Sequence, residues 1–262
     1  MPNASTSFFG WVAFLLEKYG MLFLRGTGMT LLIALTGTAL GFALGLLVAI
    51  IRTIALPEKK KTGSNVGVIL RRGLLRLAQL LMNVYIQVFR GTPMIVQAVV
   101  IYYGAQYAGV YMDTTFAAIF IISINTGAYM CETVRGGIQS IDPGQIEAAH
   151  ALGMTYPQTL RRIILPEAFE VALPTLGNSF ISIIKGTSLA FTCAVVEITA
   201  QGQIIGGRTY RYFEVYVSLA IIYWLVTLVI EQIIRVIENK IRIPDQVELA
   251  SANGEGKKND KN

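Results

Sequence analysis

Long apolar stretches alternate with shorter polar segments along most of this chain. A helix needs ~20 mostly apolar residues to cross the hydrocarbon core of a bilayer. Three uncharged stretches meet or approach that length. Two further stretches are less regular, because Lys185 interrupts one of them and the other is short. The pattern therefore predicts five membrane-spanning helices, at residues 29–51, 91–112, 114–131, 171–196 and 215–230.

Residues 8–24 are also apolar, but Glu17 and Lys18 interrupt them, and Trp11 and Tyr19 suit the headgroup region of a bilayer. The segment is predicted to be an amphipathic helix at the membrane interface, with a sixth crossing as the alternative. Between the first two spans, residues 57–67 predict a polar loop. Residues 68–89 then resume a helical pattern whose arginines suit headgroup anchoring.

The predicted fold class is therefore all-α, a polytopic membrane protein. Residues 1–28 form an external tail that contains the interfacial helix, and residues 29–240 form the transmembrane domain. Residues 241–262 lose apolar content and predict a disordered polar tail. In the first span Gly37, Gly41 and Gly45 share one helix face, which permits close approach of another helix of this chain, or of a second chain.

Composition supports a membrane protein, because 53% of the residues are hydrophobic and the mean hydropathy is +0.55. The net charge of +6 does not indicate nucleic-acid binding, since no basic patch alternates with aromatic residues. Cys131 and Cys193 lie in apolar stretches and are interpreted as small buried side chains. His150 is the single histidine of the sequence, and no metal site is expected around it.

Lysine and arginine are distributed asymmetrically between the predicted loops. Segments 52–76, 132–170 and 231–262 hold seven, three and six basic residues, whereas segments 1–28 and 198–214 hold two each. Cytoplasmic loops of membrane proteins carry the excess of basic residues. This bias predicts an external N-terminus and a cytoplasmic C-terminus.

The polar segment between the third and fourth spans carries two helix-start signals. Asp142 is a candidate N-cap before Pro143, with Gln145 placed to reach back to the cap. Gly153 then suits a left-handed turn that ends the helix. Thr155 and Gln158 form a capping-box pattern for a second start. The local sequence therefore predicts a helix, a glycine corner and a second helix.

The same segment contains a longer pattern: Glu147-Ala148-Ala149, then Gly153, then Ile163-Ile164-Leu165-Pro166. It resembles the EAA signature in the membrane subunits of ABC importers. Flanking motifs resemble permeases of the polar amino-acid uptake family (histidine, glutamine and arginine type) in the same order, over most of residues 25–240. These motifs are Val88-Phe89-Arg90-Gly91-Thr92-Pro93, Gly127-Ala128-Tyr129, Glu132-x-x-Arg135-Gly136-Gly137-Ile138 and Ile184-Lys185-Gly186-Thr187-Ser188-Leu189. Gly186 is a departure, because relatives often carry an acidic residue there.

The resemblance implies a type I ABC importer permease fold in a bacterial cytoplasmic membrane, with a cytoplasmic coupling helix in residues 136–170. It implies that this helix docks on an ATPase subunit dimer, through Glu147, Ala148, Ala149, Gly153, Ile163, Leu165 and Pro166. It further implies a second permease chain and an external solute-binding protein. No phosphate-binding loop of the Gly-x4-Gly-Lys-Ser/Thr type occurs in the sequence, so ATP and Mg²⁺ are expected at the partner ATPase. This chain is expected to bind no cofactor and to catalyse no reaction.

Polar residues inside apolar spans are costly and are candidates for a solute pathway. The candidates are Gln97, Asn125, Tyr129, Glu132, Asn178, Ser182 and Lys185. Each has contact between helices as its alternative role. Near the cytoplasmic ends of their spans, Arg90, Glu132 and Arg135 are expected to snorkel or to pair with one another, with a direct part in transport as the alternative.

Glu197, Arg208 and Arg211 are predicted to contact the binding protein or simply to face solvent. The main alternative function is an ion-gradient-driven transporter or channel, which should show duplicated halves or clustered buried acids; this sequence shows neither. A membrane-anchored scaffold would leave the capped corner unexplained.

Overall fold

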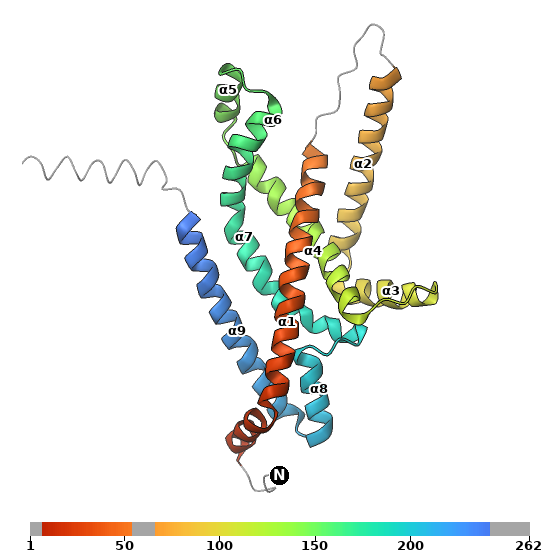
Figure 1. Cartoon of the computed structure of the whole chain (residues 1–262), viewed down its shortest axis with the longest axis vertical. Helices are drawn as coiled ribbons and strands as arrows, with labels where there is room; N and C mark the ends of the chain where they lie inside the picture. Colours follow the sequence, from red (N-terminus) through yellow and green to blue (C-terminus); the bar gives the residue numbers. More distant parts are fainter. Residues whose placement is uncertain (1–6, 54–65, 242–262) are drawn as a thin grey trace, which may run out of the picture.

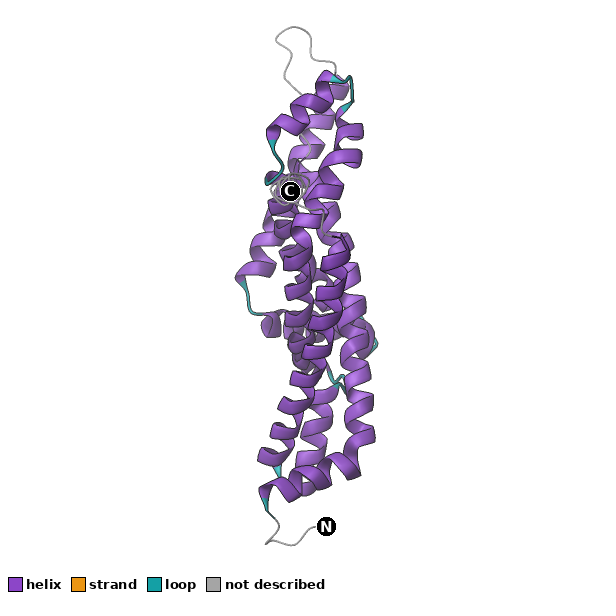
Figure 2. Ribbon diagram, turned by 90° about the vertical axis from the view of Figure 1, so that its left-hand side faces the viewer, coloured by secondary structure: helices purple, strands orange, loops and turns teal. Residues whose placement is uncertain are grey.

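The computed structural model describes residues 7–53 and 66–241, and Figure 2 shows these residues as helices joined by short loops. In chain order the helices are α1 (Phe8–Thr53), α2 (Val66–Gly91), α3 (Met94–Tyr107), α4 (Thr114–Gln139), α5 (Pro143–Ala151), α6 (Tyr156–Thr159), a π-helical turn η1 (Leu160–Ile164), α7 (Leu165–Gly186), a 3-10 segment η2 (Thr187–Cys193), α8 (Ile198–Thr209) and α9 (Tyr212–Ile241). Helices α5 and α6 lie at one end of the elongated molecule, and α8 lies at the other end (Figure 1).

Helix α1 includes both the predicted interfacial helix and the first predicted span. It is a single helix of 46 residues, although its first turns are tilted in Figure 1. The N-terminal part buries Leu15 and Phe23 against Ile198 and Ile205 of α8 and Val215 of α9. The structure thus differs from the predicted separate interfacial helix, because one face of this segment packs on protein.

The predicted second span at residues 91–112 is broken in the structure. Helix α2 ends at Gly91, α3 begins at Met94, and the two are bent by 113°. Pro93 explains the break, since it lacks an N–H and disfavours a helical conformation in the preceding residue. Helix α3 has 14 residues, too few to cross a bilayer alone, and it projects sideways from the other helices (Figure 1).

Helices α1, α4 and α9 are long and apolar enough to span a membrane, and α2 with α3 makes a fourth candidate if the bent pair is one span. Helix α7 has 22 residues, about 33 Å at 1.5 Å per residue, but it is not one of these candidate spans. The described residues therefore support a polytopic helical protein, and the count of five spans stays a prediction.

The glycine stripe of α1 packs against α4 of the same chain. A Cβ atom on Gly37 would lie 2.6 Å from Ile122, one on Gly41 would lie 2.7 Å from Thr126, and one on Gly45 would lie 2.7 Å from Met130. Each glycine costs a helix about 1 kcal/mol relative to alanine, so the close approach of the two backbones has to offset this cost. Of the two roles considered for the stripe, the structure shows the internal contact.

Replacing Gly41 with valine should destabilise the protein, because the new Cβ would lie 2.7 Å from Thr126 Cβ and 3.0 Å from the Ser123 carbonyl oxygen. Overpacking of this kind costs about 1–3 kcal/mol, and we expect a lower unfolding temperature in detergent. Gly28→Val is the matched control, since no atom lies within 4 Å of a Cβ at that position in α1. Equal unfolding temperatures for the two variants would contradict the packing described.

Candidate functional site

A cavity of about 470 Å³ lies between α4 and α7 and is closed on one side by the start of α3. Its lining residues are Met94, Ile122, Asn125, Thr126, Tyr129, Met130, Thr175, Asn178, Ser179, Ser182, Ile183 and Gly186. Residues at every fourth position share a helix face, which explains how Asn125 and Tyr129 come together on one wall and Asn178, Ser182 and Gly186 on the other. Sequence reasoning missed Thr126, Thr175, Ser179 and Gly186, although the same four-residue spacing could have indicated them.

Helices α4 and α7 approach closely on the α5 side of the cavity. A Cβ atom on Gly137 of α4 would lie 2.6 Å from the carbonyl oxygen of Ala168 in α7. Away from this contact the two helices diverge, as Figure 1 shows. The cavity therefore lies where the two helices are apart. Their close contact lies between the cavity and the corner formed by α5 and α6.

Gln97 is a helix-to-helix contact and does not line the cavity. Its Nε2 donates to the carbonyl oxygens of Phe89 and Thr92, both at 2.9 Å, and so satisfies acceptors at the end of α2. Its Oε1 accepts from Nδ2 of Asn125 at 2.8 Å. Gln97 is therefore a support for the cavity wall, because it holds Asn125 in place.

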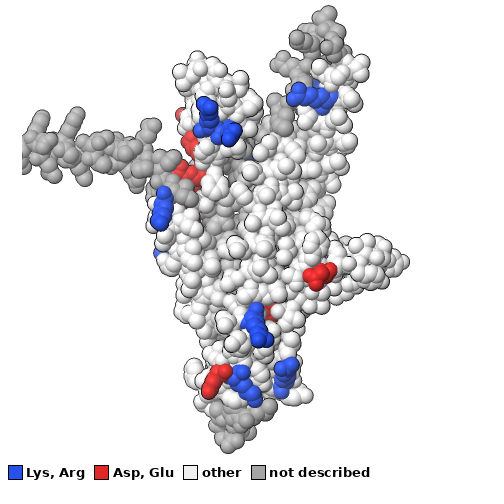
Figure 3. Space-filling view, in the orientation of Figure 1, with Lys and Arg blue, Asp and Glu red and all other residues white. Residues whose placement is uncertain are grey.

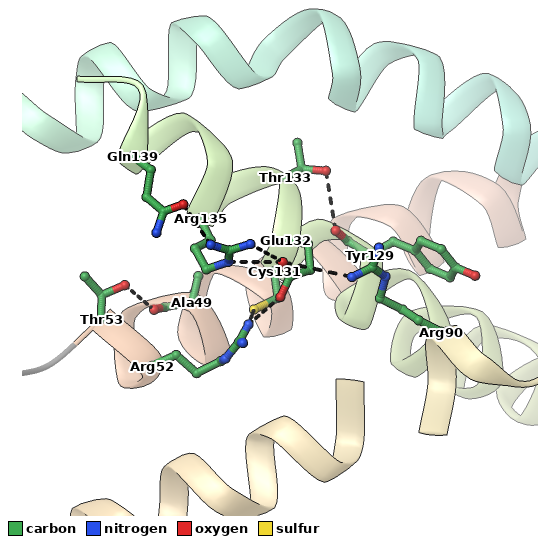
Figure 4. Close-up of polar contacts among 10 residues, drawn as sticks. All are labelled: Ala49, Arg52, Thr53, Arg90, Tyr129, Cys131, Glu132, Thr133, Arg135 and Gln139. Carbon is green, nitrogen blue, oxygen red and sulfur yellow. Dashed lines mark hydrogen bonds and ion pairs between the residues drawn. The ribbon is translucent and has the colours of Figure 1, made fainter. Parts of the chain in front are cut away.

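Glu132 also lies outside the cavity lining, at the centre of an ion cluster formed with Arg52, Arg90 and Arg135 (Figure 4). Arg52 Nη1 donates to Oε1 at 2.5 Å, and Arg135 donates from Nη2 and Nε to Oε2 at 2.7 and 3.0 Å. Arg90 is looser, with Nη1 3.9 Å from Oε2, and its guanidinium lies 5.6 Å from the ring centroid of Tyr129. The expected pairing of Arg90, Glu132 and Arg135 is confirmed, and Arg52 is an additional member that ties α1 to α4.

Lys185, the last predicted pathway residue, is exposed and is not among the residues that line the cavity. It immediately precedes Gly186, which does line it. Within residues 7–53 and 66–241, Lys185 makes no ion pair.

The polar segment between α4 and α7 has the local conformation that its sequence predicts. Asp142 Oδ1 accepts from the Gly144 N–H at 2.9 Å, Gly153 has a φ of 78°, and the Thr155 N–H donates to Gln158 Oε1 at 2.8 Å. The prediction for Gln145 is wrong, because its Nε2 donates across to Glu167 of α7 at 3.0 Å. This bond joins the corner to α7.

The side chains of the corner divide into an exposed and a buried set. Glu147 and Ala148 are exposed, but Ala149 is only 2% exposed and so does not belong to the outer surface. The outer surface instead includes Leu152, which is 83% exposed, and Tyr156, which is 47% exposed. Sequence reasoning missed Leu152, although an apolar residue directly before a helix-ending glycine is a usable signal.

Helix α7 begins in a π-helical turn that connects it to α6 without a break. The Leu165 N–H bonds to the Leu160 carbonyl oxygen, five residues earlier, and Pro166 follows. Proline cannot donate and crowds the carbonyl four residues before it, which a wider turn relieves. Ile164 is buried with Ile141 and Ala168, whereas Ile163 and Leu165 are partly exposed and Pro166 is exposed. Tyr156 to Gly186 is therefore one continuous helical run.

The prediction that Glu197 contacts the binding protein or faces solvent is wrong, because this residue is fully buried. Its Oε1 accepts from the Ala200 N–H at 2.8 Å and caps α8, and its Oε2 accepts from Thr30 at 3.4 Å and Tyr223 at 3.3 Å. Arg211 pairs with Glu214 at 3.2 Å and lies 4.5 Å from the Trp11 ring centroid, whereas Arg208 is exposed.

Apolar helices around a cavity that offers amide and hydroxyl groups, with a capped corner at one end, are features of a membrane-spanning transport subunit. Residues 63–243 match the binding-protein-dependent transport system inner membrane component. The chain belongs to this family, the permease subunits of ABC importers. The family places it in the inner membrane and makes it a transport subunit.

Individual relatives agree over most of the chain. It is 38% identical over 213 residues to the probable amino-acid ABC transporter permease protein PatM of Vibrio harveyi, covering 80% of this chain and 87% of that one. It is 38% identical over 224 residues to the glutamine transport system permease protein GlnP of Escherichia coli K12, covering 85% and 94%.

Solved structures show the same fold. A chain from the crystal structure of an amino acid ABC transporter with histidines matches with a TM-score of 0.75 at 33% identity, covering 90% of this chain and 99% of that one. A chain of the inward-facing methionine transporter MetNI matches with a TM-score of 0.65 at 21% identity, covering 87% and 99%. The predicted all-α type I importer permease fold is confirmed.

The buried carboxylate of Glu197 should be needed for stability. It accepts from the Ala200 N–H and from the hydroxyls of Thr30 and Tyr223. Replacing Glu197 with alanine leaves these buried donors without their acceptor, which costs about 1–3 kcal/mol for each group that stays unsatisfied.

We expect Glu197→Gln to lose less stability than Glu197→Ala, because the amide keeps one acceptor oxygen in nearly the same shape. Unfolding temperatures in detergent measure the difference, and equal values for the two variants would contradict the role of the carboxylate.

Proposed function

We propose that this chain is the permease of an ATP-driven importer of polar amino acids. The observation that carries the proposal is the cavity between α4 and α7, which offers amide and hydroxyl groups and whose two walls lead to the capped corner. Relatives named as amino-acid and glutamine permeases support the substrate class. ATP is hydrolysed by a separate ATPase subunit dimer, which also binds the Mg²⁺, and an external binding protein delivers the solute.

The cavity is the proposed solute site. Asn125, Asn178 and Ser182 offer amide and hydroxyl groups, which can both donate to a carboxylate and accept from an ammonium group. A zwitterionic amino acid can thus be held without burial of a permanent protein charge. Asn178, Ser182 and Tyr129 are exposed in the single chain, so a second permease chain, identical or different, covers this face in the assembled importer.

The corner is the proposed coupling element. Glu147, Ala148 and Leu152 form its exposed surface, and Gly153 sets the turn. In this proposal they occupy a groove of the ATPase, with Ala149 seated beneath them and Ile163, Leu165 and Pro166 joining the corner to α7. Closure of the ATPase dimer then displaces the corner, and α7 follows because the helix is continuous from Tyr156.

The corner faces the cytoplasm in this proposal. Arg71 and Arg72 of α2 and Arg161 and Arg162 of η1 lie towards the end of the molecule that carries α5, where Figure 3 shows basic side chains. Basic residues favour the cytoplasmic side of a membrane. This orientation places the N-terminus outside and the C-terminus inside.

Uptake by proteoliposomes tests the function. The chain, its cognate ATPase and its binding protein should import labelled glutamine with ATP inside, and should not do so with a non-hydrolysable analogue. Uptake that follows an ion gradient and needs no ATP would instead support the secondary-transporter alternative and contradict the proposal.

Replacing Gly153 with valine should weaken docking of the ATPase. The φ of 78° is unfavourable for a β-branched residue, at about 1–2 kcal/mol, although no atom lies within 4 Å of the new Cβ. We expect about tenfold weaker association of the ATPase with permease in nanodiscs, and unchanged membrane insertion.

Gly136→Val is the control for this substitution, because Gly136 also has open space around its Cβ but has no positive φ. Equal ATPase affinity for the Gly153 and Gly136 variants would count against the role of the corner.

A further inference from the structure

The cavity between α4 and α7 has no charged group in its lining. All the residues that line it are apolar, hydroxyl-bearing, amide-bearing or glycine. A solute with a charged side chain therefore meets no ionic partner on the walls themselves. The charges that lie next to the walls decide which solutes the cavity favours.

On the α4 side, the neighbouring charge is positive. Three guanidinium groups surround the single carboxylate of Glu132, so the cluster has an excess of two positive charges. Arg52 and Arg135 already hydrogen-bond both carboxylate oxygens of Glu132. Glu132 is therefore not free to pair with a cationic solute.

Arg90 connects the positively charged cluster to the cavity lining through Tyr129. Its guanidinium is the loosest in the cluster, 3.9 Å from Glu132, and it lies over the ring of Tyr129, whose side chain lines the cavity. The Arg90 side chain is 44% exposed, so it keeps free donors. A solute carboxylate beside Tyr129 would meet a cation that is not fully neutralised.

Charges of both signs lie next to α7 but outside the cavity lining. Lys185 directly precedes the cavity-lining Gly186, and Glu238 Oε1 of α9 lies 3.5 Å from a Cβ placed on Gly177, which directly precedes the cavity-lining Asn178. Helix α3 begins at the wall, at Met94, and the N-terminus of a helix favours negative charge. The α4 wall and the start of α3 thus both favour an anionic group.

We infer that the cavity accepts amino acids with a neutral or acidic side chain and rejects those with a cationic side chain. The inference rests on the proposed function, because it names the substrate class of the same cavity. A cationic side chain would lose its hydration next to Arg90 without gaining a carboxylate partner in the cavity lining. The α-carboxylate common to all amino acids is favoured by the same charges.

Gly186 offers a direct way to reverse this preference. A Cβ at Gly186 has no atom within 4 Å, so a small side chain fits without displacement of a neighbour. Gly186→Asp places a carboxylate at the cavity wall beside Lys185, and Gly186→Asn is the control of nearly equal shape without the charge.

The experiment measures binding of labelled glutamine, citrulline and arginine to the permease–ATPase complex in nanodiscs, without binding protein. Citrulline is a neutral analogue of arginine with nearly the same shape. We expect the wild type to bind glutamine and citrulline at least about tenfold more tightly than arginine. Gly186→Asp should reduce this preference at least about tenfold, and Gly186→Asn should preserve it.

Arginine binding as tight as that of citrulline in the wild type would overturn the inference, as would equal effects of the two Gly186 variants or binding of none of the three probes. ATP-driven glutamine uptake, measured on the same preparation with binding protein, separates the two proposals. If uptake occurs without discrimination in the cavity, the inference alone fails. If no ATP-driven uptake of any amino acid occurs, the proposed function fails.

Discussion

The structure depends on the unbroken helical run from Tyr156 to Gly186. It begins at the glycine corner, passes through the π-helical turn and ends at the wall of the cavity. A helix transmits displacement along its axis with little change in length, since most of its residues are bonded to neighbouring turns. Pro166 and Pro174 lack such a bond, but the run continues through both. The corner and the cavity wall are therefore parts of one continuous element.

Helix α4 provides the fixed wall against which α7 can move. Glycines of α1 hold α4 at close backbone distance, and Arg52 adds an ionic tie to Glu132 near the end of α1. Helix α7 touches α4 most closely at Gly137 and Ala168, between the corner and the cavity. This close contact is a natural pivot, because displacement on its corner side would change the separation of the helices at the cavity.

Sequence patterns predicted the local conformation correctly where it depends on residues that are close together in the chain. The caps at Asp142 and Thr155 and the left-handed turn at Gly153 were predictable because each depends on residues a few positions apart. The cost of polar residues inside apolar spans likewise indicated Asn125, Tyr129, Asn178 and Ser182 as candidates, and the structure brings these four together around one cavity. The family resemblance supplied the order of these elements.

Predictions failed where a side chain met a distant partner. Gln145 bonds to Glu167, Ala149 is buried beneath the corner, and Glu197 is enclosed by Thr30 and Tyr223. Gly91 and Pro93 permit a kink, but hydropathy alone could not show how sharply the polypeptide turns there, by 113°. These outcomes depend on tertiary packing, which a periodic pattern does not encode.

The most direct test of the mechanical connection is the number of amino-acid molecules imported per ATP hydrolysed. Two glycines inserted between Ile164 and Leu165 would interrupt the helical run and leave the corner residues intact. The same insertion between Tyr210 and Arg211, in the connection between α8 and α9, serves as the control. We expect the first insertion to preserve ATPase association and hydrolysis while import per ATP falls towards zero. An unchanged ratio would contradict this expectation.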